Sequence, residues 1–145
     1  MKGKTMENPT YIFERTALYY ETDQMKIVHH SNYIRWFEEA RIAYMNSAGL
    51  PYSKMEELGV MIPVLGVDCE YKKPVRFDQT VLIYVKITEF TGVKLIIEYE
   101  VRDKETGNLH ITGHSKHCFV KADSFRPVRL SKDYPEMAEI FTVKQ

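Results

Sequence analysis

The sequence predicts an α+β fold in which an antiparallel sheet curls around one helix. Two observations support this prediction. From Tyr33 to Ser47, aromatic and small residues recur at spacings of three and four, which indicates a helix with one broad apolar stripe. After Gly59 the period changes to two, and long alternating segments follow one another with short turns between them. A helix this aromatic must bury its stripe, and the apolar face of an antiparallel sheet can cover it.

The elements before the sheet are predicted from local signals. Residues 11–20 are rich in aromatic and β-prone side chains and indicate a strand. The helix is expected to have its N-cap at Ser31 or Asn32 and to end before Gly49, which is suited to the C′ position. Residues 51–58 are consistent with a second, short helix.

Four long strands are predicted after Gly59, at residues 60–72, 80–90, 93–103 and 109–120. Pro63 is expected at an edge or a bulge of the first, because proline has no N–H for a ladder. The alternation turns these side chains inward: Val81, Ile83, Val85, Ile87, Leu95, Ile97, Tyr99 and Val101. We expect one domain over residues 1–145, with residues 1–10 as a loose leader, one helical turn near 136–141, and residues 123–145 packing on the sheet.

The composition of the chain excludes several classes of protein. The 145 residues suit a single domain, and 20 basic residues balance 20 acidic ones. This balance gives no support for binding to nucleic acid or to an anionic membrane. No apolar run is long enough to span a membrane, and the polar start of the chain lacks the apolar region of a signal peptide. Two cysteines make no disulfide framework, so a reducing cytoplasm is expected.

The stretch from Tyr19 to Tyr33 concentrates reactive side chains beside the start of the predicted helix. Asp23 lies in the loop before the helix, where an isolated Asp is more often a solvated or capping residue. A general base or nucleophile at this place needs a nearby group that stabilises an oxyanion, and free N–H groups at a helix N-terminus do so. His29 and His30, adjacent in an extended loop, are expected to point apart.

A second group of side chains has the composition of a metal site but not its spacing: His110, His114, His117 and Cys118. On a strand, His114 and Cys118 share a face ~13 Å apart, and His117 points to the opposite face. We therefore expect no metal site, and we find no cofactor-binding motif. Cys69 and Cys118 have no helix N-terminus beside them and are expected to be inert, buried thiols.

A small basic group follows the predicted strand 60–72. It consists of Lys72, Lys73 and Arg76. These side chains belong either to a solvated turn or to a contact with the phosphates of a ligand.

Several segments together resemble one family. They are Glu21-Thr22-Asp23, Val28-His29-His30-Ser31-Asn32-Tyr33, Trp36-Phe37-Glu38-x-Ala40-Arg41 and Tyr71-x-x-Pro74-Val75-Arg76-Phe77-Asp78. They are similar to motifs of the 4-hydroxybenzoyl-CoA thioesterase-like family of hotdog-fold acyl-CoA thioesterases, and the resemblance extends over nearly the whole chain. It implies an antiparallel sheet of about five strands around one long central helix. It also implies a homo-oligomer, a dimer or a dimer of dimers (a homotetramer), with sites at the protomer interface.

The resemblance further implies roles for residues of the loop. Asp23 corresponds to the catalytic carboxylate, and the backbone N–H of His30 corresponds to the donor that polarises the thioester carbonyl. Whether Asp23 attacks the carbonyl or activates water stays open. Many relatives have Gly at the position of Lys26; if that Gly adopts a positive φ, Lys is strained there.

We therefore expect hydrolysis of an acyl-CoA thioester to a carboxylic acid and free coenzyme A, without a cofactor. The residues expected to line the acyl pocket are Tyr33, Met61, Ile62, Pro63 and Val64, and those expected to contact phosphate are Lys72, Lys73 and Arg76. Three alternatives share the fold: an acyl-acyl-carrier-protein thioesterase, a hotdog dehydratase and a non-catalytic acyl-binding protein. The dehydratase motifs place His in a proline-containing context that is absent after His30.

Overall fold

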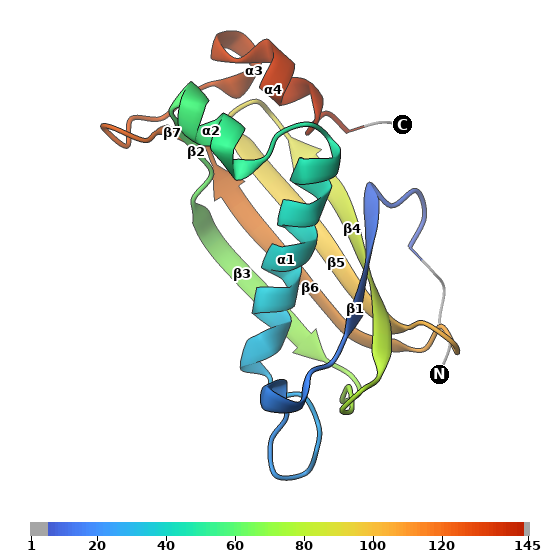
Figure 1. Cartoon of the computed structure of the whole chain (residues 1–145). Helices are drawn as coiled ribbons and strands as arrows, with labels where there is room; N and C mark the ends of the chain where they lie inside the picture. Colours follow the sequence, from blue (N-terminus) through green and yellow to red (C-terminus); the bar gives the residue numbers. More distant parts are fainter. Residues whose placement is uncertain (1–5, 144–145) are drawn as a thin grey trace.

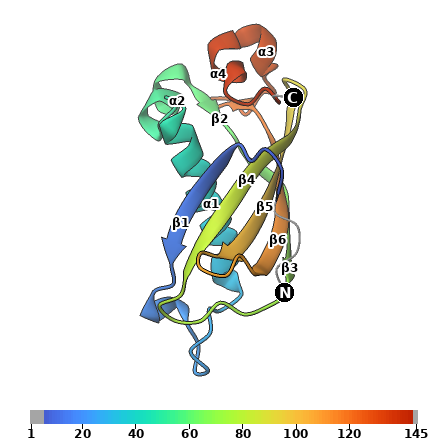
Figure 2. The ribbon, with the colours of Figure 1, turned by 90° about the vertical axis from the view of Figure 1, so that its right-hand side faces the viewer.

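The computed structural model describes residues 6–143, in which a five-stranded antiparallel sheet curls around one long helix, α1 (Ser31–Ser47) (Figure 1). The strands lie in the order β1-β4-β5-β6-β3. Figure 2 shows α1 crossing one face of this sheet. The five strands are β1 (Tyr11–Thr16), β3 (Val64–Tyr71), β4 (Thr80–Phe90), β5 (Lys94–Asp103) and β6 (Leu109–Cys118). Two layers around a shared core confirm the predicted fold class.

The face of the sheet that meets α1 is the predicted one. All eight side chains expected inward on β4 and β5 are buried, with exposed fractions of 4% or less. On α1, the buried residues Trp36, Phe37 and Ala40 lie one helical turn apart or less, as the apolar stripe requires. Phe37 stacks on Tyr99 of β5, with ring centroids 4.4 Å apart. The core therefore lies between the stripe of α1 and the concave face of the sheet.

Gly113 of β6 allows α1 to approach the sheet this closely. A Cβ at this position would lie 2.5 Å from Cε2 of Phe37 and 2.5 Å from the carbonyl oxygen of Asp68. Real Cβ atoms do not approach other atoms so closely, and one of the two contacts is backbone, which cannot rotate away. Gly113 is thus required by the stacking of Phe37 on Tyr99.

Helix α1 begins earlier than predicted, and its N-cap is His30 rather than Ser31 or Asn32. The side chain of His30 makes no capping hydrogen bond. The hydroxyl of Ser31 instead pairs with Nδ1 of His29 at 2.9 Å, and Nδ2 of Asn32 donates to the carbonyl of Glu21 at 3.0 Å. The two capping candidates are therefore occupied by other partners. At the other end Gly49, with φ of 87°, terminates the helix as predicted.

Two predicted strands are shorter or divided. The strand predicted at residues 11–20 ends at Thr16, and Tyr19–Glu21 form a 3₁₀ turn, η1. The strand predicted at residues 60–72 is two strands, because β2 (Val60–Met61) pairs with β7 (Val120–Lys121) while β3 pairs with β6. Pro63 lies between β2 and β3, where the missing N–H costs no ladder bond. The predicted strand 109–120 likewise divides into β6 and the start of β7.

Three short helices gather beside the C-terminal end of α1 (Figure 1). They are α2 (Tyr52–Leu58), α3 (Leu130–Asp133) and α4 (Pro135–Glu139). Phe141, which follows α4, is fully buried against Phe90 and Phe119. Residues 1–5 of the expected leader lie outside the described residues, but Thr10 already bonds to β4 through the Val85 carbonyl, 2.7 Å from its nitrogen. No helix within residues 6–143 has the length and apolar character needed to cross a bilayer.

Candidate active site

The loop between η1 and α1 is a tight reverse turn that presents Asp23. Thr22 and Val28 pair as an antiparallel bridge, and the Asp23 N–H donates to the Ile27 carbonyl at 2.9 Å. Within the turn, the Lys26 N–H donates back to the Asp23 carbonyl at 2.9 Å. Oδ1 of Asp23 accepts the N–H of Met25 at 2.8 Å, which orients the carboxylate. The side chain remains exposed, so it is available to a ligand.

Lys26 adopts the left-handed conformation, with φ of 62°. This conformation is unfavourable for a residue with a Cβ and costs about 1–2 kcal/mol. The surrounding structure enforces it, because the Lys26 carbonyl accepts the N–H of Phe77 at 3.0 Å and Ile27 pairs with Arg76. The strain anticipated at this position is therefore present, and the Lys26 side chain is exposed to solvent.

The first N–H groups of α1 are not all satisfied. The Asn32 N–H donates to the His29 carbonyl, the Tyr33 N–H to the His30 carbonyl, and the Ser31 N–H to the ring of His29. Among the described residues, the N–H of His30 has no hydrogen-bond partner. A free donor thus remains at the positive end of a 17-residue helix.

The imidazoles of His29 and His30 stack, with centroids 4.2 Å apart and an interplanar angle of 30°. The expectation that they point apart is wrong, because the bond from His29 to Ser31 turns its ring back over the helix start. Both rings are exposed. The pair therefore forms one aromatic wall.

A pocket of about 330 Å³ gathers the loop, the start of α1 and the end of β3. Five of the predicted site residues line it: Asp23, His30, Tyr33, Lys72 and Lys73. Tyr71 adds an aromatic wall, with its ring 6.0 Å from His30 and 5.7 Å from Tyr33. The Tyr33 hydroxyl accepts the Val75 N–H at 3.2 Å, and burial raises the pKa of Tyr33. This phenol is therefore a neutral, fixed wall of the pocket.

Other predicted site residues lie elsewhere. Met61, Ile62 and Pro63 line a separate pocket of about 370 Å³, beside the middle of α1 and α2. Val64 is exposed and lines neither pocket, and Arg76 lies outside both linings. The cause is strand geometry: Val64 and Tyr71 are opposite ends of β3, ~23 Å apart. Within one protomer these residues therefore do not line the pocket of Tyr33 and Asp23, and the expectation of a shared acyl pocket stays a prediction for the assembled oligomer.

Comparison with known proteins gives the family. A sequence profile described as the thioesterase-like superfamily matches residues 18–141. The chain is 37% identical over 118 residues to the Bacillus subtilis protein named "Putative acyl-CoA thioesterase YneP", an alignment that covers 81% of this chain and 85% of that protein. The chain belongs to the thioesterase-like superfamily.

Solved structures of thioesterases share the fold of this family member. A DHNA-CoA thioesterase from Staphylococcus aureus superposes with a TM-score of 0.83 at 33% identity, covering 90% of this chain and 87% of that one. BH1999 gentisyl-coenzyme A thioesterase has a TM-score of 0.78 at 22% identity, covering 91% of this chain and 100% of that one, which shows the fold alone. The predicted hotdog fold and family are confirmed, and the protein is a thioester hydrolase.

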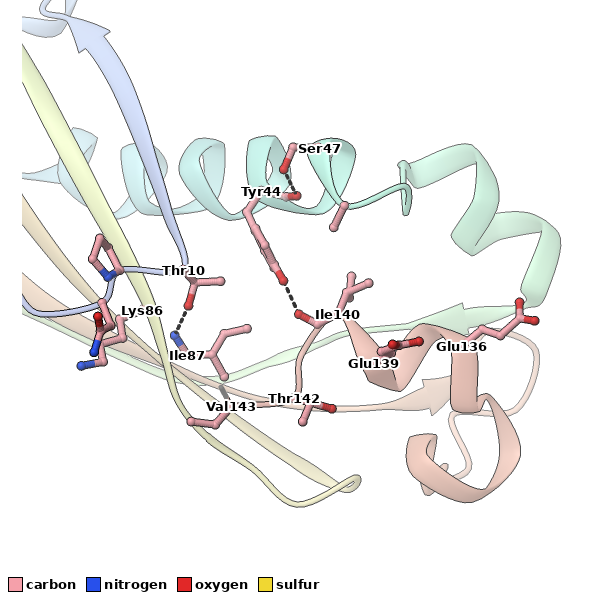
Figure 3. Close-up of a pocket in the computed structure, with 13 residues that line it drawn as sticks. Thr10, Tyr44, Ser47, Lys86, Ile87, Glu136, Glu139, Ile140, Thr142 and Val143 are labelled. Carbon is pink, nitrogen blue, oxygen red and sulfur yellow. Dashed lines mark hydrogen bonds between the residues drawn. The ribbon is translucent and has the colours of Figure 1, made fainter. Parts of the chain in front are cut away.

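A larger cavity in this thioesterase, about 830 Å³, lies at the other end of α1 (Figure 3). Tyr44 of α1 points across it toward Ile140, and its lining also includes Ile87 of β4 and the acidic residues Glu136 and Glu139 of α4. No residue of the loop that carries Asp23 lines this cavity. This cavity therefore contains none of the residues of the candidate site.

The histidines of β6 are engaged separately. Nε2 of His117 pairs with the Ser115 hydroxyl at 2.7 Å inside the core, whereas Nδ1 of His114 pairs with Asp68 at 3.1 Å on the opposite face. No group of three His, Cys, Asp or Glu side chains within residues 6–143 could hold a metal ion. Cys69 is half-buried, and burial raises the pKa of its thiol to about 11, which keeps it protonated.

Sequence reasoning did not identify Tyr71, Pro74 and Ile111 as lining residues of the site pocket. Tyr71 and Pro74 stand in a quoted family motif, so that motif carried a signal. Ile111 carried none, because it is one apolar residue of a regular strand. Reasoning from the sequence also missed Glu21, whose side chain is buried although it immediately precedes the exposed loop.

Proposed function

We propose that this thioester hydrolase cleaves acyl-CoA substrates, with Asp23 as the base or nucleophile and the His30 N–H as the oxyanion donor. One observation carries the proposal: Asp23 lines the same pocket as His30, whose N–H has no partner among the described residues. A donor that the fold leaves free at a helix N-terminus is suited to the charge that develops on a thioester oxygen.

In the proposed reaction the thioester oxygen accepts the His30 N–H, which makes the carbonyl carbon more electrophilic. As a general base, Asp23 takes a proton from water, and the hydroxide adds to the carbon. The C–S bond then breaks, the acid forms, and the thiolate of coenzyme A takes up the proton. As a nucleophile, Asp23 would first form a mixed anhydride and release the thiol, and water would then hydrolyse the anhydride.

The two routes differ in where oxygen from water first appears. After a single turnover in H₂¹⁸O, ¹⁸O in the Asp23 peptide indicates an anhydride hydrolysed at the aspartyl carbon. Label in the acid product alone supports direct attack by water, provided that hydroxylamine traps no aspartyl hydroxamate.

The acyl group that fits this pocket best is a planar aromatic one. Tyr71 packs edge-on against His30, with ring centroids 6.0 Å apart, and tilted against Tyr33 at 5.7 Å, so the three rings form one aromatic surface that a flat acyl group can contact. The relative from Staphylococcus aureus is named for an aromatic acyl group, DHNA-CoA, which supports the same class. Lys72 and Lys73 at the pocket edge, with Arg76 nearby in the chain, are suited to the phosphates of coenzyme A.

The acyl pocket is completed, we infer, by a second copy of the chain. Within residues 6–143, β3 is an edge strand paired with β6 alone, and Val64, Leu65 and Val67 expose 52%, 65% and 42% of their surface. If two β3 strands pair antiparallel about a twofold axis, the Val64 end of one lies beside the Tyr71 end of the other. Residues 61–64 of the partner would then reach the pocket of Asp23, as the predicted acyl pocket requires.

Subunit mixing tests this arrangement. Asp23→Asn and Met61→Arg should each abolish activity. A re-equilibrated equal mixture should recover about a quarter of wild-type activity, because half the dimers are mixed and each has one intact site. A monomer by light scattering, or no recovery in mixtures shown to contain mixed dimers, would refute the shared pocket.

The function itself is tested by thiol release from short, long and aromatic acyl-CoA thioesters and from an acyl-acyl-carrier protein. We expect Asp23→Asn to lower kcat by about 10²–10⁴-fold. The matched control is Asp123→Asn, an exposed Asp on the turn after β7, which should behave as wild type. Release by Asp23→Asn at the wild-type rate would overturn the mechanism, and release from no substrate would favour an acyl-binding protein.

A further inference from the structure

Glu21 has a buried carboxylate, with 5% of the residue exposed, next to a loop that is otherwise open to solvent. Four N–H groups point at it. Arg15 donates from both terminal nitrogens at 2.9 and 2.6 Å, the Leu18 backbone at 2.9 Å, and the Trp36 indole at 2.9 Å. These donors come from β1, from the N-cap residue of η1 and from α1, and Glu21 itself is in η1, so the carboxylate joins three elements.

The partners of this carboxylate are all donors, which only the ionised form can satisfy. Burial alone raises the pKa of Glu21, but the bonds from Trp36, Arg15 and Leu18 outweigh it, so its pKa lies below the usual value. An amide in place of the carboxylate would direct an NH₂ group at a donor and would lose the paired bonds of the guanidinium.

The backbone of Glu21 reaches the other end of the loop. Its carbonyl accepts the His29 N–H at 2.8 Å and Nδ2 of Asn32 at 3.0 Å. Asp23 is two residues after Glu21, and His30 is one residue after His29. The residue that precedes the loop is thus also bonded to the residues that begin the helix.

Arg15 extends this contact to the outer side of α1. Its Nε donates to Glu39 at 2.7 Å, and its guanidinium carbon lies 5.1 Å from the centroid of the Trp36 ring. Glu21 itself does not line the pocket of Asp23. It therefore cannot touch a substrate there, and any effect on the reaction must act through the loop.

We propose that Glu21 is a positioning residue, whose carboxylate locks η1 to α1 and thereby holds Asp23 at the correct distance from the free N–H of His30. The proposal rests on the proposed function for its catalytic consequence. Its structural consequence, a defined loop between residues 22 and 30, stands independently of the substrate.

The test compares Glu21→Gln with Glu100→Gln. Glu100 is a matched control, because its carboxylate pairs with the buried Arg102 at 2.9 Å on β5, outside the site. We expect Glu21→Gln to lower kcat by about 10–100-fold, as misplacement of a catalytic group does, with KM changed less than about threefold. Glu21→Asp, which restores the charge, should recover part of the loss. Glu100→Gln should keep wild-type kcat.

A spectroscopic measurement separates positioning from general loss of stability. The chain has one tryptophan, so the Trp36 indole gives a single N–H signal in a ¹H–¹⁵N spectrum. In Glu21→Gln this signal and the amides of residues 22–30 should shift more than all others, while Glu100→Gln leaves them in place. If Glu21→Gln does not fold, the same measurements are made on Arg15→Lys, which keeps the positive charge but loses the paired hydrogen bonds to Glu21.

Unchanged amides at Asp23 and His30 in a folded Glu21→Gln protein, or an equal loss of kcat in Glu100→Gln, would overturn the positioning role. If wild-type protein hydrolyses no thioester, the proposed function fails, but the shift of the loop amides still supports or refutes the role of Glu21 on its own.

Discussion

The two ends of α1 are completed in different ways. At the N-terminal end the His30 N–H has no partner among the described residues, Lys26 is strained and Asp23 is exposed. At the C-terminal end Gly49 provides a left-handed stop without strain, and the Ala48 N–H bonds back to the Tyr44 carbonyl at 3.0 Å.

The larger cavity lies at the C-terminal end, and the reactive groups lie at the other. The proposed chemistry therefore lies beside the smaller of these two pockets. Its support is the combination of a helix N–H without a protein partner, a strained backbone and a carboxylate in one loop, since strained residues often cluster at functional sites.

Among changes to α1 and its caps, the largest effect is expected when the free N–H of His30 is removed. His30 has φ of −56°, which proline can adopt, and its N–H makes no bond within the described residues. His30→Pro should therefore fold and yet lower kcat by about 10²–10³-fold, as does the loss of an oxyanion-hole donor. His30→Ala, which keeps the N–H, should lose much less. Equal kcat for the Pro and Ala variants, with unchanged circular dichroism, would remove the N–H from the mechanism.

Acid should weaken the fold beneath α1. His117 is fully buried, and burial followed by the nearby Arg41 charge lowers its pKa to about 4. Because the unfolded chain binds a proton near pH 6.5 and the folded chain does not, this stabilisation is complete above pH 6.5 and is lost as the pH falls toward 4. The loss should reach about 3 kcal/mol.

Urea unfolding at several pH values between 7 and 4.5 measures this slope. His117→Asn should flatten it, whereas His114→Asn, on the exposed face, should not. An unchanged slope in His117→Asn would assign the acid sensitivity to other groups.

At the C-terminal end, Tyr44→Phe removes the hydrogen bond from the Tyr44 hydroxyl to the Ile140 carbonyl, which spans the large cavity (Figure 3). The free energy of unfolding should fall by about 1 kcal/mol, while kcat stays at the wild-type value. Denaturant melts and thiol-release assays on the same preparation check both. A fall in kcat would show that the two ends are coupled through α1.

The smallest effect concerns the strained loop. Lys26→Gly should be about 1 kcal/mol more stable than Lys26→Ala, because only Gly adopts φ of 62° without cost. Both variants lose the charge, so a KM shared by the two and higher than wild type would indicate that Lys26 contacts the phosphates. Equal stability of the two variants would contradict the strain.

Periodicity was sufficient for much of the fold. The strand at Thr80–Phe90 was predicted with its observed bounds, and the inward residues of β4 and β5 were all identified. Errors occurred where a side chain or a proline decided the local structure. The first strand ends at Thr16, before η1, the turn that contains Glu21. The predicted strand 60–72 is divided at Pro63.

The sequence by itself determined the α+β class, the helix with its buried stripe and, through its motifs, the resemblance that singled out Asp23 and His30. These features depend on spacing along the chain, which periodicity and motifs record. Only the tertiary structure decided that the His30 N–H is free, that Lys26 is strained, that Met61 lies away from Asp23, and that Glu21 is surrounded by donors. These features depend on which groups meet between segments that are far apart in the sequence, and hydrogen bonds can be assigned only once those partners are in place.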